Sequence, residues 1–188
     1  TMVQPRPTAR IPIIQFVDPE TDFECDISFN NPLAVCNTSL LRAYSQVDSR
    51  VRPLAYIIKA WAKARQMNSP GEGTLSSYGY ILLLLHYLQT RTPAVIPNLQ
   101  RLPPDWNGSY LPPSTKSQVQ PQPDTFEMEL NPVDGTPCRT YFYQPQNEEK
   151  KKKLYSYGSN NKQSVAELLV GFFKYYAYDF DFRASVVS

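Results

Sequence analysis

Asp26 is the residue whose type and setting best suit metal chemistry. It lies in FECDISF, residues 23–29, where apolar and polar residues alternate as they do in a strand with one buried face. The pattern predicts that Asp26 lies on the polar face, where a rigid strand can present its carboxylate to a divalent ion. One carboxylate cannot hold two catalytic metal ions, and an exposed aspartate on a strand is by default ordinary surface. The residue alone leaves both interpretations open.

Lys59 and Lys63 are four residues apart, so a helix would place their ammonium groups on one face. That face lies away from the apolar positions Leu54, Ile57 and Trp61. Paired ammonium groups suit the binding of phosphates. The alternative interpretation is a solvated helix face.

Ser76-Ser77-Tyr78 stands at the start of a third apolar segment. A helix N-terminus offers free N–H groups and a dipole that favours anions, so a serine here can cap the helix or bind phosphate. Tyr78 offers an aromatic face on which a nucleobase could stack. The structural alternative is an ordinary N-cap followed by a core tyrosine.

Asn37 and Thr38 stand at the start of the first helical segment. Their short amide and hydroxyl groups suit a sugar hydroxyl, although the same residue types are common at turns and helix starts.

Three other features are weaker candidates. Asp179 and Asp181 form a D-x-D pair, but they follow an amphipathic helix and not a strand, so we do not expect a catalytic pair there. The Lys150–Lys153 run could form a basic nucleic-acid patch, but two glutamates precede it, so a solvated loop is the preferred interpretation. His86 lies in an apolar run and is interpreted as a satisfied histidine and not as a catalytic base.

The elements that must position these residues change character along the chain. Residues 1–10 are interpreted as a tail, and 11–17 with 23–29 as a strand hairpin around the turn 18–22. Four helices are expected from the periodicity of their apolar residues, at 33–45, 50–67, 76–90 and 164–178. Ser164 and Glu167 form a capping box at the start of the last one. A two-stranded hairpin is not a stable sheet by itself, so its apolar face is expected to need further strands.

Proline is abundant, with 18 residues, and many of them fall in one central stretch. Because proline fixes φ and removes an N–H donor, residues 95–123 are expected to be irregular. The sequence therefore indicates an α+β chain: a strand hairpin in 1–31 and a helical domain in 32–188, with a proline-rich insert around 93–147.

Composition excludes several classes of protein. The chain has 188 residues, enough for one domain with a real core, and a net charge of +2, so bulk charge gives no argument for nucleic-acid binding. Its longest apolar stretch, around Tyr80–Leu85, is too short to span a bilayer. Three cysteines without a C-x-x-C spacing and a single histidine make a disulfide scaffold and a structural zinc site improbable. Any metal chemistry then rests on carboxylates, which favours Mg²⁺ or Mn²⁺.

These residues and motifs together resemble the cytoplasmic poly(A) and poly(U) polymerases, the terminal uridylyltransferase group of the polymerase-β-like nucleotidyltransferases. The resemblance rests on three segments that cover most of the chain outside the proline-rich insert: RIPIIQFVDPETDFECDISFNNPLAVCNTSLL, RPLAYIIKAWAKARQMNSPGEGTLSSYGYILLLLHYLQ and SVAELLVGFFKYYAYDFDFRASVVS. It implies a β-hairpin from the catalytic palm sheet followed by the poly(A)-polymerase-associated helical domain.

The resemblance also implies roles for the candidate residues. Asp26 matches the last of three catalytic aspartates that bind divalent metal, Mg²⁺ or Mn²⁺. Five of the other residues match positions around the nucleotide, ATP or UTP: Asn37 and Thr38 near the ribose, Lys59, Lys63 and Ser77 on the triphosphate. Tyr78 matches the tyrosine that stacks on the base. The implied second partner is an RNA 3′ end, in the cytoplasm or in the nucleus.

Two departures from the family pattern limit what is expected of this chain alone. The family has a Gly-Ser turn with a D-x-D ahead of the position of Asp26 and a base-recognition loop after its last segment, and residues 1–188 contain neither. The resemblance therefore implies a chain that is truncated at both ends. We therefore expect a chain that is inactive by itself, because phosphoryl-type transfer relies on metal electrostatics. The alternatives are a non-catalytic homologue that binds RNA or protein, and one subunit of a split enzyme. A protein partner for the proline-rich insert rests on composition.

Overall fold

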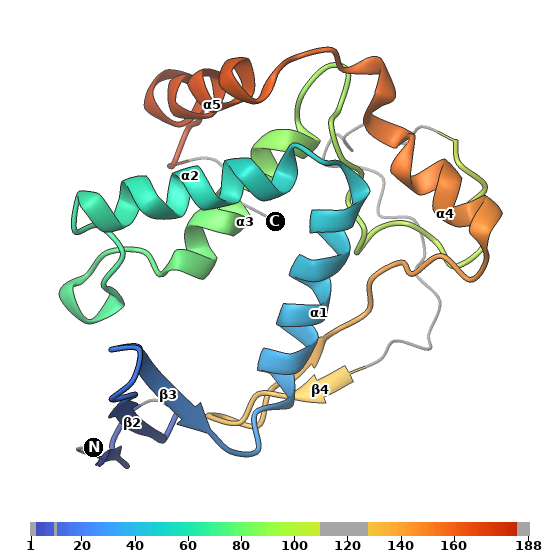
Figure 1. The fold of residues 1–188 in the computed structure, drawn as a ribbon. Coiled ribbons are helices and arrows are strands. Elements are labelled where there is room, and N and C mark those ends of the chain that lie inside the picture. Colours follow the sequence, from blue (N-terminus) through green and yellow to red (C-terminus); the bar gives the residue numbers. More distant parts are fainter. Residues whose placement is uncertain (1–2, 10, 110–127, 184–188) are drawn as a thin grey trace. The chain divides into compact units, whose positions relative to one another are not determined.

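The computed structural model of the chain describes residues 3–9, 11–109 and 128–183 (Figure 1). Its contacts divide the chain into two compact units. The strand unit comprises Thr1–Leu40 and Pro123–Tyr141, and the helical unit comprises Leu41–Gln122 and Phe142–Ser188. The mixture of helices and small sheets confirms the predicted α+β class. The predicted domain boundary after residue 31 stays a prediction.

The strand unit contains a three-stranded antiparallel sheet. Its strands follow one another along the chain in the order β1 (Val3–Arg6), β2 (Ile13–Val17) and β3 (Glu24–Ser28). The predicted hairpin is confirmed as β2 and β3, with Gln15 directly opposite Asp26. The predicted tail is wrong, because part of it forms β1. Pro5 obscured this strand in the sequence, but β1 is an edge strand, where a proline breaks no ladder between two neighbours.

The apolar side of β3 is exposed, although the alternation of residues predicted a half-buried strand. Phe23 and Phe29, which flank the strand, are 69% and 74% exposed, and Ile27 is 43% exposed. The prediction is wrong because alternation shows that one face is apolar but does not supply the layer that would cover it.

A second, two-stranded antiparallel sheet belongs to the same unit. Its strands are β4 (Met128–Leu130) and β5 (Pro137–Arg139), and they were not predicted from the sequence. Much of the proline-rich run, residues 110–127, lies outside the described residues.

The helical unit is built from helices whose buried faces follow the predicted periodicity. The four expected helices are confirmed with ends shifted by a few residues: α1 (Pro32–Val47), α2 (Val51–Ala64), α3 (Ser77–Gln89) and α5 (Val165–Lys174), the last continued by a π-helical turn, Tyr175–Asp179. α1 begins in the strand unit and ends in the helical unit. α2 ends three residues before the predicted Met67 because Gln66 has a φ of 55°, which a right-handed helix does not allow. In the described residues no helix has the length and apolar content to cross a membrane.

One further helix, α4 (Glu148–Tyr155), occupies the segment that was interpreted as a solvated loop. That interpretation is wrong. The Asn147 side chain accepts a hydrogen bond from the Lys150 N–H, and two glutamates in the first turn with lysines in the last complement the helix dipole.

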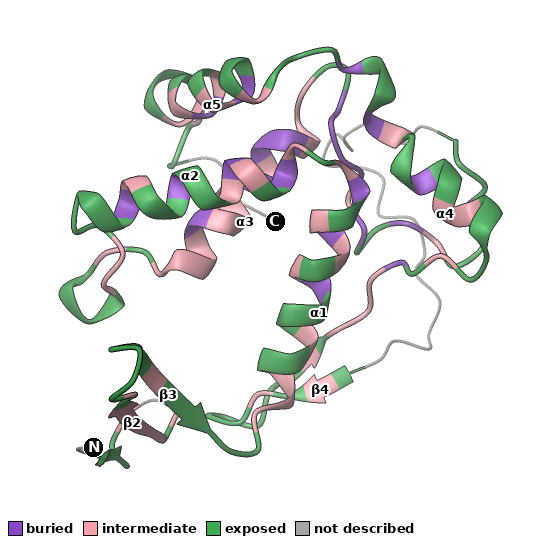
Figure 2. Ribbon diagram, viewed as in Figure 1, coloured by how far each residue is buried: buried purple, intermediate pink, exposed green. Residues whose placement is uncertain are grey.

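Helices α2, α3 and α5 share a dry core (Figure 2). α3 and α5 both pack against α2. The core also takes in the segment after α3, which has no regular secondary structure over Ala94–Leu99, as expected, yet buries Val95, Ile96 and Leu99 completely. The irregular segment is therefore an interior part of the helical unit.

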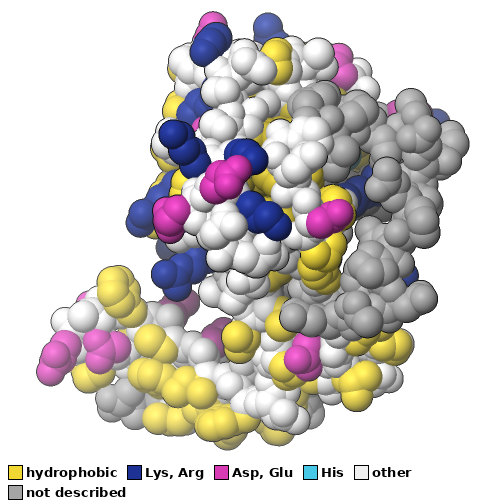
Figure 3. All heavy atoms as spheres, turned by 90° about the vertical axis from the view of Figure 1, so that its right-hand side faces the viewer, with side chains coloured by type: hydrophobic (Ala, Val, Ile, Leu, Met, Phe, Trp, Pro, Cys, Tyr) yellow, Lys and Arg dark blue, Asp and Glu magenta, His cyan; other side chains and the backbone are white. Residues whose placement is uncertain are grey.

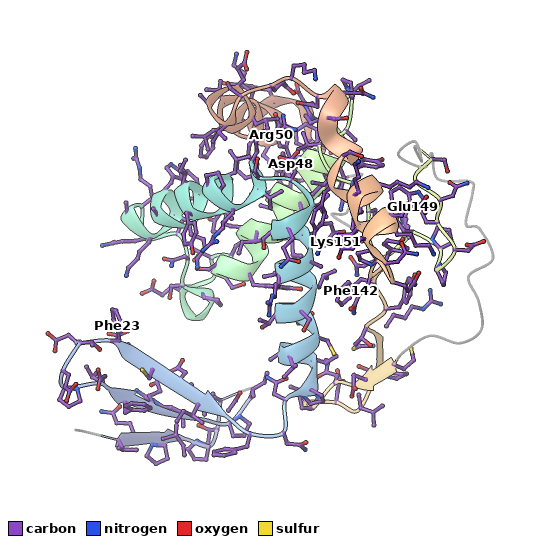
Figure 4. All side chains as sticks on the ribbon, turned by 45° about the vertical axis from the view of Figure 1, so that its right-hand side comes forward. Phe23, Asp48, Arg50, Phe142, Glu149 and Lys151 are labelled. Carbon is purple, nitrogen blue, oxygen red and sulfur yellow. The ribbon has the colours of Figure 1, made fainter. Side chains whose placement is uncertain are left out.

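A charged hub holds the junction of α1 and α2 to the chain ahead of α5. Arg50 forms an ion pair with Asp48 at 2.8 Å and donates hydrogen bonds to the carbonyls of Gly158, Asn161 and Gln163 (Figure 4). Asn161 is buried and donates to the Pro93 carbonyl at 2.7 Å. Burial alone would raise the pKa of Asp48, but the hydrogen bonds and charge of Arg50 outweigh it and hold that pKa below its usual range.

Candidate functional site

The seven candidate residues fall in both units, so each half of the candidate site is described by itself. Asp26, Asn37 and Thr38 belong to the strand unit, and the other four, Lys59, Lys63, Ser77 and Tyr78, belong to the helical unit.

Asp26 lies on β3 and is exposed, as predicted. Its Oδ1 accepts a hydrogen bond of 3.0 Å from Nε2 of Gln15 on β2, and Oε1 of Gln15 accepts one of 2.9 Å from Nε of Arg6 on β1. A polar row therefore crosses all three strands and orients the carboxylate. Gln15 was missed in the sequence, although the register of the predicted hairpin could have placed it opposite Asp26.

Asp26 fits a divalent cation as a single ligand. Mg²⁺ is commonly held by one or two carboxylates together with substrate phosphates and water, and Asp26 offers an exposed carboxylate held by one amide donor. Within residues 3–9, 11–109 and 128–183, no three or more His, Cys, Asp or Glu side chains come together in a way that could hold a metal ion. Among these residues Asp26 is the carboxylate that we assign to a metal ion, and no such group of three is found around it.

Asn37 and Thr38 lie within the first two turns of α1, and both are exposed. The Thr38 hydroxyl donates to the Ala34 carbonyl at 2.8 Å, four residues earlier. Its oxygen can still accept a hydrogen bond. The two side chains are consecutive in α1 and available to a polar ligand.

Lys59 and Lys63 are both exposed on α2, while Leu54, Ile58 and Ala62 are buried. Neither lysine forms an ion pair with any residue that the structure describes. Two like charges one helical turn apart without acidic partners repel each other, and a bound anion relieves that repulsion.

The start of α3 divides two tasks between two serines. Ser76 is the N-cap, and its hydroxyl accepts a hydrogen bond of 3.1 Å from the Gly79 N–H. Ser77 is the first helical residue, so its N–H has no partner within the helix. Tyr78 is half-buried, and this burial raises the pKa of its hydroxyl. The cap is thus provided without Ser77 or Tyr78.

Tyr80 fixes the start of α3 beside α2. Its hydroxyl donates to the Met67 carbonyl at 3.0 Å, and its ring meets that of Trp61 edge-on, with 6.1 Å between ring centroids. Trp61 lies between the two lysines in sequence. The fold therefore holds the lysine-bearing half of α2 and the first turn of α3 in one local region of the helical unit.

The weaker candidates have other surroundings. His86 is half-buried: its Nε2 lies 3.4 Å from the Tyr175 hydroxyl, and burial together with the nearby charge of Arg91 lowers its pKa. Asp181 follows the π-helical turn and accepts a hydrogen bond from the Arg183 N–H at 2.9 Å. Neither arrangement resembles a nucleophile–base pair or a metal centre.

Comparison with known proteins shows that the chain is similar to RNA nucleotidyltransferases. Residues 1–46 match the family described as "Poly(A) RNA polymerase, mitochondrial-like, central palm domain", and residues 164–188 match the "Cid1 family poly A polymerase". A crystal structure of the Cid1 poly(U) polymerase bound to Mg and 3′-dATP aligns with 99% of this chain and 49% of its own, at 37% identity and a TM-score of 0.69. A structure of Cid1 in complex with its short product ApU aligns with the same TM-score.

Two curated relatives narrow the class. The poly(A) RNA polymerase GLD2 of Rattus norvegicus is 36% identical over 96% of this chain, and the terminal uridylyltransferase cid1 of Schizosaccharomyces pombe is 37% identical over the same share. The matched part is 31% of the first relative and 38% of the second. The chain is thus similar to members of the poly(A) polymerase/Cid1 family of RNA nucleotidyltransferases over about a third of their length.

Proposed function

We propose that this chain forms the nucleotide-binding part of an RNA 3′-terminal nucleotidyltransferase, which adds UMP or AMP from UTP or ATP to RNA 3′ ends. The observation that carries the proposal is in the helical unit. Two exposed lysines on α2, which have no acidic partner among the residues the structure describes, lie beside an α3 N-terminus that presents Ser77 and Tyr78. This combination of cations, free N–H groups and an aromatic ring suits a nucleoside triphosphate.

Each side chain has a defined task in this proposal. Lys59 and Lys63 bind the triphosphate, Ser77 adds a hydroxyl and an N–H donor to it, and Tyr78 stacks on the base. Asn37 and Thr38 bind the ribose. Asp26 contributes one ligand to a divalent ion, Mg²⁺ or Mn²⁺, whose chemistry is to stabilise the charge of the transferring phosphoryl group.

The relatives support this class of reaction. Their names describe poly(A) polymerases and a terminal uridylyltransferase, and one solved neighbour contains Mg with a nucleotide. We extend the proposal to the cytoplasm as location and to the proline-rich insert as a site for a protein partner.

A second candidate function is a non-catalytic module that binds nucleotide or RNA. The exposed lysines of α2 and the start of α3 favour this alternative, because they can bind a nucleotide whether or not transfer follows. The two functions differ in whether nucleotide binding leads to transfer.

Nucleotide binding by the 188-residue chain tests the first step. Titration calorimetry with UTP and ATP in Mg²⁺ should show binding that the Lys59→Ala/Lys63→Ala variant weakens at least tenfold, because each lost charge-assisted hydrogen bond costs about 1.5–3 kcal/mol. Lys162→Ala/Lys174→Ala removes two exposed lysines elsewhere in the helical unit and should bind like the parent. Equal affinities for the two double variants would refute the assigned lysine pair.

A primer-extension assay tests the second step. We expect the chain alone to add no nucleotide to an RNA oligonucleotide in Mn²⁺, because Asp26 is the one carboxylate that we assign to a metal ion and this chemistry relies on metal electrostatics. Extension that disappears in the Asp26→Ala variant would show instead that other groups complete the metal site.

A further inference from the structure

Helix α4 lies outside both segments matched by the family descriptions, residues 1–46 and 164–188. It carries four consecutive lysines, Lys150–Lys153, to which the proposed nucleotide site assigns no role. On the face that carries α4, Lys and Arg side chains are intermixed with acidic ones (Figure 3).

Two of the four lysines attach α4 to the rest of the helical unit. Lys150 donates through Nζ to the Pro104 carbonyl at 3.3 Å and to the Gln146 side chain at 2.8 Å. The aliphatic part of the Lys153 side chain packs on Gly108: a Cβ added to Gly108 would lie 3.0 Å from the Cδ of Lys153. The Nζ of Lys153 forms an ion pair with Glu149 at 2.7 Å. Leu154 is buried on the same helix.

The other two lysines line a shallow surface hollow. Its walls are formed by Glu148, Lys151, Lys152, Tyr155 and Ser156. Glu148, Lys151, Lys152 and Tyr155 follow the i, i+3, i+4, i+7 spacing of a helix, so they share one face of α4. Tyr155 is 40% exposed, which leaves part of its ring accessible.

The charges of this face are available to a ligand. Lys152 forms no ion pair with any residue the structure describes, and Lys151 pairs with Glu148 at 3.3 Å. Both partners of that pair are solvent-exposed, so its net contribution to stability is small and a phosphate can replace the carboxylate.

We propose that the α4 face formed by Lys151, Lys152 and Tyr155 binds single-stranded RNA, with the two ammonium groups on successive phosphates and the tyrosine ring stacked on a base. Cationic groups beside an exposed aromatic ring are the combination that holds single strands without sequence preference. A membrane surface fits less well, because α4 has no exposed aliphatic side chain to insert: its one aliphatic residue, Leu154, is buried. The inference deepens the proposed function, since it gives the RNA substrate a second contact away from the nucleotide.

Fluorescence anisotropy of the 188-residue chain with a labelled 15-nucleotide oligo(U), over a series of KCl concentrations, tests this site. Lys151→Ala/Lys152→Ala should weaken binding about tenfold near 0.1 M salt and lower the slope of log K against log [KCl] by about 1.4, because each phosphate contact contributes about 0.7. Lys162→Ala/Lys174→Ala, with the same loss of charge, should leave both quantities unchanged.

Substitutions at Tyr155 and Glu148 distinguish base stacking from general electrostatic attraction. Tyr155→Ala should weaken oligo(U) binding at least fivefold and leave an abasic 15-mer unaffected, whereas Tyr155→Phe retains binding. Glu148→Gln removes the competing carboxylate and should tighten binding two- to threefold, an increase that a misfolded variant would not give.

Three results would overturn the assignment. These are equal losses in the two double-lysine variants, no difference between Tyr155→Ala and Tyr155→Phe, and stronger binding to phosphatidylserine vesicles than to RNA. Asp26→Ala and Lys59→Ala/Lys63→Ala should keep this RNA binding. An unsubstituted chain that binds oligo(U) through α4 but binds neither UTP nor ATP would refute the proposed function and leave the α4 site standing. An unsubstituted chain that binds nucleotide, but whose RNA binding the α4 substitutions do not change, would refute the α4 site alone.

Discussion

The strand unit and the helical unit place their apolar side chains in opposite ways. Among the described residues, every buried hydrophobic side chain except Leu40 belongs to the helical unit. The strand unit instead exposes large apolar side chains, including Phe23, Ile27 and Phe29. Because burial of apolar surface is the main favourable term in folding, the helical unit has its own source of stability, while the small sheet has hydrogen bonds and little else.

The two halves of the candidate site therefore differ in how firmly the surrounding structure holds them. The lysines of α2 and the start of α3 are supported by a packed core, which fixes their geometry. Asp26 lies on a three-stranded sheet whose apolar side is incompletely buried, with Ile27 exposed and Ile14 half-buried. Its position therefore depends on β-ladder bonds and on Gln15. Local opening free energies follow the density of buried contacts, and the strand unit should therefore open first.

Truncation of an apolar side chain should give the largest difference between the two units in the free energy of unfolding. Leu84→Ala in α3 removes a fully buried side chain and should lower the free energy of unfolding by about 3–5 kcal/mol. Ile27→Ala in the exposed side of β3 should cost less than about 1 kcal/mol. Urea unfolding followed by tryptophan fluorescence is the measurement, because both tryptophans, Trp61 and Trp106, lie in the helical unit. Equal losses would show that the sheet and the helices unfold as one cooperative body.

Arg50→Met should give the next largest effect, about 2–3 kcal/mol. The variant keeps much of the side-chain volume but removes the donors to Asp48 and to the carbonyls ahead of α5, and bonds to charged groups are worth about this much. Arg52→Met, on the exposed side of α2, is the matched control and should stay within about 0.5 kcal/mol of the parent. If both substitutions cost the same, the hub does not stabilise the helical unit.

Gly171→Ala tests the packing of α5 on α3 and should cost about 1–3 kcal/mol. A Cβ at this position would lie 2.1 Å from the Tyr87 hydroxyl oxygen, and the next atom of that ring is 3.2 Å away. In a double-mutant cycle, adding Tyr87→Phe to Gly171→Ala should restore at least half of the lost free energy of unfolding, because it removes the hydroxyl that the new Cβ would meet. Gly71→Ala, where a Cβ meets nothing within 4 Å, is the control. Without recovery in the double variant, the contact does not limit the residue at position 171.

Local patterns predicted the helical unit well because its helices carry their own signals. The apolar spacing of Leu54, Ile58 and Ala62 defines the buried face of α2. The capping box of Ser164 and Glu167 marks the start of α5 as predicted. Both signals act within a few residues, so one sequence contains all the information they need.

The features that the sequence did not predict depend on residues far apart in the chain or lack an apolar periodicity. Arg50 and Asn161 are 111 positions apart, and no local pattern pairs them. α4 has one buried side chain, so it lacks the apolar periodicity by which helices are recognised, and only its cap and its charge order marked it. The roles of the candidate site residues stay predictions, because the lysine and aspartate positions belong to different units.

The acid dependence of stability should give the smallest effect, because one ionisation is responsible. The pKa of Asp48 is lowered in the folded state by Arg50, so the unfolded chain binds more protons over the range between its unfolded and folded pKa. The stabilisation from this pair is therefore fully present above about pH 4–5, near the ordinary pKa of aspartate, and is lost as the pH falls through the folded pKa. Tryptophan-monitored urea unfolding of the parent and of Asp48→Asn should show a difference that narrows as the pH is lowered from 6 toward 3. A difference that stays constant over this range would show that the ionised form of Asp48 does not stabilise the helical unit.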